Sequence, residues 1–201
     1  VSEAKSMDAD IVCFPELNLT GYHVRAPVAE AAEPIDGAVV NAVKSVAATH
    51  RIAIVAGMAE RECETGSKAL YATQFVVNAA GEMVCHYRKA HLGPPEKELF
   101  TPGDQIPPLV TLDGFTFSIQ LCYDAHFPEM TTQMAIAGAD AIFIPHASPG
   151  TSAAAKIKSW MRHLPARAFD NGLFVIAVNP VGDNGCGLNF PGTSLMLSPA
   201  G

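Results

Sequence analysis

The feature that most constrains the fold is a series of short apolar segments, some joined by tight turns and others by helical patterns. Residues 71–78 and 82–87 read as strands on either side of Ala79-Ala-Gly81, which predicts a β-hairpin. Residues 141–144 and 173–178 are almost wholly apolar, and a helical pattern lies between them. Hairpins mixed with strand–helix units predict an α/β fold with a mixed sheet covered by helices.

The same patterns place the other elements. We expect strands over residues 11–14, 52–56, 109–112, 115–121 and 193–197, and helices over residues 1–9, 36–50 and from about 124 to 136. A long helix is expected to begin after Ser152, which can cap it, and to be kinked by Pro165. Since no repeat or linker divides the chain, we expect one domain over residues 1–201.

Composition excludes several classes of function. Apolar residues make up 49% of the 201 residues, and the formal net charge is −7, so neither disorder nor a nucleic-acid partner is expected. No apolar run reaches the roughly 18 residues that span a bilayer, and the first residues do not read as a signal peptide. The five cysteines are scattered and form no CxxC pair, which indicates a reducing, cytoplasmic setting without a structural zinc site.

Cys122 lies where the strand pattern of residues 115–121 gives way to a helical one. A residue at such a junction is held at the edge of the sheet, near backbone N–H groups that favour a thiolate. The alternative is that Cys122 is a small buried apolar residue, as most free cysteines are. Its position therefore makes it a candidate nucleophile whose role depends on the rest of the chain.

Two further reactive residues also end apolar strands. Glu16 follows Phe14-Pro15, and Lys89 follows the strand that ends at Tyr87. A glutamate can take the proton of a thiol, and an ammonium can stabilise a developing oxyanion. Glu16 could equally be a solvated loop residue, but together Glu16, Lys89 and Cys122 are chemically sufficient for acyl transfer through a thioester.

At these residues the sequence resembles the nitrilase superfamily of carbon–nitrogen hydrolases. The resemblance covers nearly the whole chain, in the right order. The matching segments are Phe14-Pro-Glu-Leu-Asn-Leu-Thr-Gly-Tyr22, Tyr87-Arg-Lys-Ala-His-Leu92, Phe100-Thr-Pro-Gly-Asp104 and Leu121-Cys-Tyr-Asp-Ala-His-Phe-Pro-Glu129, with weaker matches at Ala166-Arg-Ala-Phe-Asp-Asn171 and Pro191-Gly-Thr-Ser194.

The resemblance implies a four-layer αββα sandwich with mixed sheets, which pairs through its helical faces into a homodimer or a higher homo-oligomer. It implies a small-molecule substrate and neither a metal ion nor an organic cofactor. It also leads us to expect that an N-terminal strand and a C-terminal segment of the family lie outside this chain.

The resemblance also implies catalytic roles. Cys122 is expected to be the nucleophile, Glu16 the general base and Lys89 the oxyanion stabiliser, with the Tyr123 backbone N–H as a second oxyanion donor. Many members carry a second glutamate in the loop after the lysine. Glu96 stands at the matching distance before Thr101-Pro-Gly103, and Glu98 is the other candidate in that loop.

The substrate is less constrained than the chemistry. The Cys122-Tyr-Asp124 sequence is more similar to amidase-type members, which act on amides or N-carbamoyl compounds, than to nitrile-hydrolysing ones. Several amidase-like relatives have an arginine where His126 stands, so an acidic substrate is less strongly indicated. We expect Tyr22, His126 and His146 to line the substrate pocket, although His146 could be an ordinary loop histidine.

Other interpretations remain open. A papain-like hydrolase would pair Cys122 with His91, His126 or His146, but it would leave Glu16 and Lys89 without a role. The chain could also be a catalytically silent interaction module, or a nitrile-hydrolysing member. The histidines show no ligand spacing that indicates a metal site.

Overall fold

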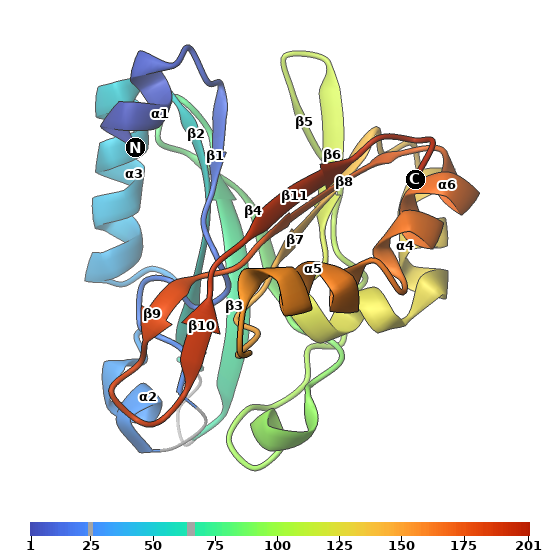
Figure 1. The fold of residues 1–201 in the computed structure, drawn as a ribbon. Helices are drawn as coiled ribbons and strands as arrows, with labels where there is room; N and C mark the ends of the chain where they lie inside the picture. Colours follow the sequence, from blue (N-terminus) through green and yellow to red (C-terminus); the bar gives the residue numbers. More distant parts are fainter. Residues whose placement is uncertain (24–25, 64–66) are drawn as a thin grey trace.

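A computed structural model of the chain describes residues 1–23, 26–63 and 67–201. Two sheets face each other, and helices cover the outer side of each (Figure 1). Helices α1 and α3 lie outside the first sheet, and α4, α5 and α6 lie outside the second. This is the four-layer αββα arrangement that the family resemblance implies.

The helices are short and separated by loops. They are α1 (Ser2–Ser6), α2 (Ala26–Ala31), α3 (Ala38–His50), α4 (Pro128–Ile136), α5 (Ala153–Trp160) and α6 (Leu164–Asn171), with two 3₁₀ helices, η1 (Pro94–Glu96) and η2 (Cys122–His126). In the described residues, no helix is long and apolar enough to cross a membrane.

Both large sheets mix parallel and antiparallel pairs. The first has the order β1-β2-β3-β4 and the second the order β11-β8-β7-β6-β5, and β9 and β10 form a separate hairpin. The strands are β1 (Ile11–Cys13), β2 (Ala53–Arg61), β3 (Leu70–Val77), β4 (Met83–Arg88), β5 (Val110–Leu112), β6 (Phe115–Ile119), β7 (Ala141–Pro145), β8 (Phe174–Val178), β9 (Val181–Asp183), β10 (Asn189–Pro191) and β11 (Ser194–Leu197).

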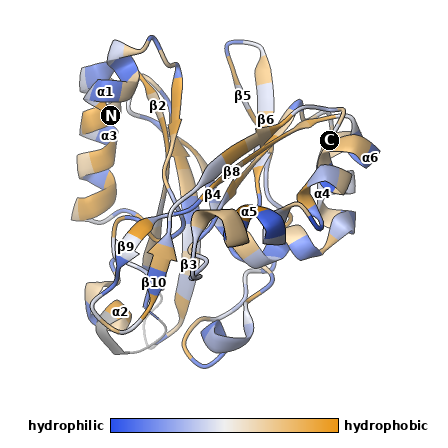
Figure 2. Ribbon diagram, in the orientation of Figure 1, coloured by the Kyte–Doolittle hydropathy of each residue, from blue (hydrophilic) through white to orange (hydrophobic). Residues whose placement is uncertain are grey.

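Strand β2 shows why the sheets pack on both faces. Successive side chains of a strand point to opposite faces, so Ile54, Ala56 and Met58 pack in one cluster with Val40 of α3. Val55, between them, points the other way and packs in the cluster between the two sheets. Hydrophobic colours accordingly run along β2, whereas α3 and α4 show mixed colours (Figure 2).

The parallel pairs bring the loops that carry the site to one place. Strand β1 pairs in parallel with β2, and β7 pairs in parallel with both β6 and β8. Residues that follow β1, β6 and β7 therefore leave the carboxyl ends of their strands, where open α/β sheets form their ligand sites.

Two local predictions were wrong. The kinked helix is in fact two helices, α5 and α6, and Pro165 lies in the first turn of α6, where its missing N–H leaves no hydrogen bond unmade. The strand before Cys122 does not pass directly into a helix, because η2 intervenes before α4. Ser152 does cap α5, since its Oγ accepts a hydrogen bond from the Ala155 N–H at 3.2 Å.

Candidate active site

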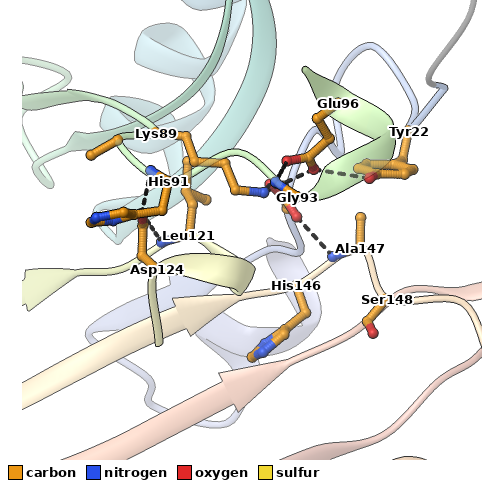
Figure 3. Close-up of polar contacts among 12 residues, drawn as sticks. Tyr22, Lys89, His91, Gly93, Glu96, Leu121, Asp124, His146, Ala147 and Ser148 are labelled. Atoms are coloured by element: carbon orange, nitrogen blue, oxygen red, sulfur yellow. Dashed lines mark hydrogen bonds and ion pairs between the residues drawn. The ribbon is translucent and has the colours of Figure 1, made fainter. Parts of the chain in front are cut away.

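A buried ammonium between two carboxylates forms the centre of the site. Lys89 Nζ lies 2.7 Å from Glu16 Oε1 and 2.8 Å from Glu96 Oε1. All three side chains are almost fully buried, and Figure 3 shows the Lys89 and Glu96 side chains meeting end to end. A lysine ammonium has three N–H donors, so one remains for a further acceptor.

Backbone contacts hold Lys89 at the end of β4. Its N–H donates to the Ala72 carbonyl at 2.8 Å, and its carbonyl accepts from the Gly103 N–H at 2.8 Å. A Cβ at Gly103 would lie 2.3 Å from the Arg88 carbonyl oxygen, so only glycine lets the loop return this closely. The long loop after β4 is thus closed over Lys89.

Glu16 is fixed between the two halves of the fold. Its N–H donates to the His146 carbonyl at 3.2 Å, and its Oε2 accepts from the Ala147 N–H at 3.1 Å. Both partners follow β7 of the second sheet, whereas Glu16 follows β1 of the first. The Ala147 amide was not anticipated from the sequence, because a backbone donor leaves no mark on residue type.

Glu96 is the last residue of the 3₁₀ helix η1, in the long loop that follows Lys89. Its Oε2 accepts from the Gly93 N–H at 2.6 Å, and its Oε1 accepts from the Tyr22 hydroxyl at 2.9 Å as well as from Lys89. Glu98, in contrast, is exposed. Of the two glutamates considered, the structure brings only Glu96 to Lys89.

Cys122 lies at the first residue of η2 with an unusual backbone. Its φ is 45°, a left-handed conformation that costs a non-glycine residue about 1–2 kcal/mol. The turn leaves the Tyr123 N–H without an acceptor among the described residues. The Cys122 thiol and this free backbone donor therefore belong to adjacent residues of the turn.

Asp124 maintains this turn and was missed by the sequence reasoning. Its carboxylate accepts from the Leu121 N–H at 2.9 Å, the Tyr87 hydroxyl at 2.9 Å and the His91 N–H at 2.8 Å. Asp124 is fully buried, and Figure 3 shows it between His91 and Leu121. It thereby ties the Cys122 turn to the loop that follows Lys89. The signal available in the sequence was an aspartate within the matching segment around Cys122.

Burial and neighbouring charges set the protonation states. Burial raises the pKa of Glu16 to about 7, with Glu96 adding to this rise and Lys89 opposing it. Burial and then the Glu16 charge raise the pKa of the Cys122 thiol, against the effect of Lys89. Burial alone would lower the pKa of Lys89, but the charges of Glu16, Cys122 and Glu96 raise it. The resting site thus holds a neutral thiol beside an ammonium.

The histidines do not support a papain-like pair. Among the described residues, none of His91, His126 and His146 hydrogen bonds to Cys122. The buried His146 ring contacts the Ile144 carbonyl, its centroid lies 4.4 Å from that of the Trp160 ring, and burial lowers its pKa to about 3. His146 thus borders the site as a neutral group.

His126 lies apart from the cluster. Its ring is exposed and stacks on His163 with the centroids 4.5 Å apart. The structure therefore brings together Glu16, Lys89 and Glu96 with Tyr22, His146 and the Cys122 turn, but not His126. No group of three or more potential metal ligands occurs in the described part of the chain.

Comparison with known proteins identifies the family. The sequence model of the carbon–nitrogen hydrolase family matches residues 1–201. The chain belongs to the carbon–nitrogen hydrolase family. The resemblance drawn from the sequence motifs is thereby confirmed.

Relatives of this carbon–nitrogen hydrolase include amidases. It is 31% identical to an (R)-stereoselective amidase of a Pseudomonas species, over 96% of this chain and 67% of that protein. It is 34% identical to a nitrilase of Pyrococcus abyssi, over 99% of this chain and 72% of that protein.

A solved structure confirms the fold. The hydrolase superimposes with a TM-score of 0.85, at 31% identity, on a mutant of the amidase from Nesterenkonia sp. AN1, covering 99% of this chain and 73% of that one. In that amidase the acetamide moiety of fluoroacetamide is bound covalently to the active-site cysteine.

Proposed function

We propose that this hydrolase cleaves the carbon–nitrogen bond of a small amide or N-carbamoyl compound through a thioester on Cys122. The observation that carries the proposal is the buried Glu16–Lys89–Glu96 cluster, whose charges act on the Cys122 thiol. The covalent cysteine adduct in the Nesterenkonia amidase supports the same chemistry.

In the first half-reaction Glu16 takes the Sγ proton while the sulfur attacks the carbonyl carbon. Because Glu16 has a pKa near 7 and the thiol a raised one, proton transfer accompanies attack and does not precede it. The oxyanion accepts hydrogen bonds from Lys89 Nζ and the Tyr123 N–H, each worth about 3 kcal/mol. Collapse of the intermediate expels ammonia or an amine, which takes the proton from Glu16.

In the second half-reaction water cleaves the thioester. Glu16 takes a proton from the water as the oxygen attacks, and the same two donors hold the second oxyanion. Collapse releases the carboxylic acid, or the carbamic acid in the case of an N-carbamoyl compound. The thiolate then regains its proton from Glu16.

Replacement of Cys122 by alanine tests the proposal. We expect Cys122→Ala to abolish ammonia release from amides, while its circular dichroism spectrum and melting temperature stay close to wild type. Cys186→Ala is a matched control, because that cysteine is exposed on the β9–β10 hairpin. Turnover by a clean preparation of Cys122→Ala would refute the assignment.

The same assay of ammonia release distinguishes the hydrolysis of amides from the hydrolysis of nitriles. A nitrilase adds two waters to a nitrile and forms the carboxylic acid and ammonia, whereas an amidase begins from the amide, which corresponds to the nitrile plus one water. The Cys122-Tyr-Asp124 sequence and the amidase relatives support the amide. We therefore expect ammonia from a short aliphatic amide and none from the nitrile of the same length.

We also infer a homo-oligomer assembled through the outer helices. The family resemblance implies such an assembly, and two apolar side chains in the outer helical layer are exposed: Met161, which follows α5, at 47%, and Phe169 of α6, at 67%. Light scattering should give at least a dimer mass, and a monomer at micromolar concentration would contradict this.

A cytoplasmic location is proposed because the cysteines, all of them described, are free.

A further inference from the structure

Lys156 of α5 provides a second ammonium close to the site, and it contacts the loop that precedes this helix. Its Nζ donates to Ser148 Oγ at 2.5 Å and to the Pro149 carbonyl at 2.8 Å. Both partners are neutral, and in the described part of the chain no carboxylate lies within ion-pair distance of Lys156. With two of three N–H donors used, one remains for a charged acceptor.

The contacts place this ammonium beside the reactive cluster. Ser148 directly follows Ala147, whose N–H donates to Glu16, and the two residues lie on the same stretch of chain in Figure 3. Partial burial lowers the pKa of Lys156, while the charge of Cys122 raises it. Lys156 thus contacts the residue that follows Ala147, and Ala147 in turn contacts Glu16 of the cluster.

The surroundings hold the lysine in place. The Ser148 N–H donates to Asn179 Oδ1 at 2.8 Å, and Asn179 Nδ2 returns a bond to the Ser148 carbonyl at 3.0 Å. A Cβ at Gly150 would approach Lys156 Cε to 3.3 Å, so the glycine leaves room for the lysine stem. Such fixed packing is unusual for a lysine that only faces solvent.

The position is also unfavourable for a cation on local grounds. Lys156 is the fourth residue of α5, close to the positive end of the helix, where acidic residues are preferred, and no acidic residue lies in that first turn. A charged residue at a locally unfavourable position, without a partner inside the protein, often lies at a functional site and binds a ligand. Glu16, Glu96 and Lys89 leave one net negative charge when both carboxylates are ionised, and this charge would repel an anionic substrate unless another cation offset it.

We propose that Lys156 binds a carboxylate of the substrate, so that the preferred substrate is a small amide carrying one carboxylate. This inference rests on the proposed amide hydrolysis. Several amidase-like relatives have an arginine where His126 stands. Lys156 would supply such a cation from a different part of the fold. The carboxylate can belong to the acyl side, as in the monoamide of a dicarboxylic acid, or to the amine side, as in an N-carbamoyl amino acid.

Matched substrate pairs test the inference. We compare kcat/KM for glutaramate with that for valeramide, and for N-carbamoyl-β-alanine with that for propylurea. Wild type should favour the charged member of one pair, which identifies the side that carries the carboxylate. Lys156→Gln should lower that charged-to-neutral ratio by about 10- to 100-fold, the range for a lost hydrogen bond to a charged group.

Lys158→Gln is the matched control. Lys158 lies on the same helix but is exposed, so its removal should leave the ratio unchanged. Lys156→Glu, checked for a wild-type melting temperature, should push the ratio below that of Lys156→Gln. A wild-type enzyme without preference for either charged member, or a ratio that Lys156→Gln does not change, would overturn the inference.

The two proposals can fail separately. Hydrolysis of neutral amides alone would leave the proposed function standing and refute the role of Lys156. If no amide is hydrolysed, the proposed function fails, and calorimetry of glutaramate and N-carbamoyl-β-alanine binding to Cys122→Ala still tests Lys156. Binding of one of them should weaken about 10- to 100-fold when Lys156→Gln is added, and unchanged or absent binding of both would count against it.

Discussion

Replacement of Glu96 by glutamine examines the cluster most sharply, because the two side chains have almost the same shape. Glu96 Oε1 accepts from Lys89 and Tyr22, and Oε2 accepts from the Gly93 N–H. A glutamine offers one acceptor oxygen and one NH₂ group. If its oxygen faces Lys89, its NH₂ faces the Gly93 N–H, and one buried donor then opposes another.

The expected loss of stability follows from this mismatch. An unsatisfied buried donor costs about 1–3 kcal/mol. At about 2–4 °C per kcal/mol for a domain of this size, the melting temperature should fall by roughly 2–12 °C. Lys89 also loses one of its two carboxylate partners, so it is held less firmly in the position from which it donates to the oxyanion. Loss of one oxyanion donor lowers kcat by about 10²–10³-fold, which sets the upper end of the expected loss.

The pH dependence adds an independent readout. The Glu96 charge helps to raise the pKa of Glu16, and Glu16 must be ionised to act as base. In Glu96→Gln the acidic limb of kcat/KM should therefore move to lower pH than in wild type, even as the maximum falls. Glu98→Gln, an exposed change in the same loop, should alter neither property. A Glu96→Gln variant with a wild-type melting temperature and an unmoved acidic limb would refute this reasoning.

Two other predictions follow from the same geometry. Since burial raises the pKa of Glu16 to about 7, wild-type kcat/KM should rise with pH through about 7 as Glu16 loses its proton, and a limb near pH 4 would contradict this. Asp124→Asn should destabilise the fold by about 1–3 kcal/mol, because an amide NH₂ would face the Leu121, Tyr87 or His91 donors. Urea unfolding measures this loss, and a change below 0.5 kcal/mol would count against it.

Hydrophobic periodicity is a local property, so it predicted a mixed sheet covered by helices, whereas the four-layer arrangement came from the family resemblance. The apolar runs in β2, β3 and β7 match strands that are buried on both faces. Element ends were less accurate around Cys122 and Pro165. There the tertiary contacts of Asp124 and the first-turn position of the proline determine the path of the chain.

The motifs pointed to the residues that we propose to be reactive, but not to the groups that hold them. Glu16, Lys89 and Cys122 each follow a strand, so their meeting at one edge could be anticipated. The backbone N–H groups of Ala147 and Tyr123 could be anticipated only in part, because backbone donors depend on conformation. Lys156 lies in α5 outside every motif, so only the folded chain shows its proximity to the loop that contacts Glu16.

Peptide mapping of the acyl-enzyme tests the central claim most directly. An activated ester of a substrate acid makes acylation fast, so the thioester should accumulate and survive an acid quench. We expect an acyl group on the peptide that contains Cys122, and none on those with the exposed Cys63 and Cys186. Turnover of the ester with Cys122 unmodified, or with the acyl group on another residue, would contradict it.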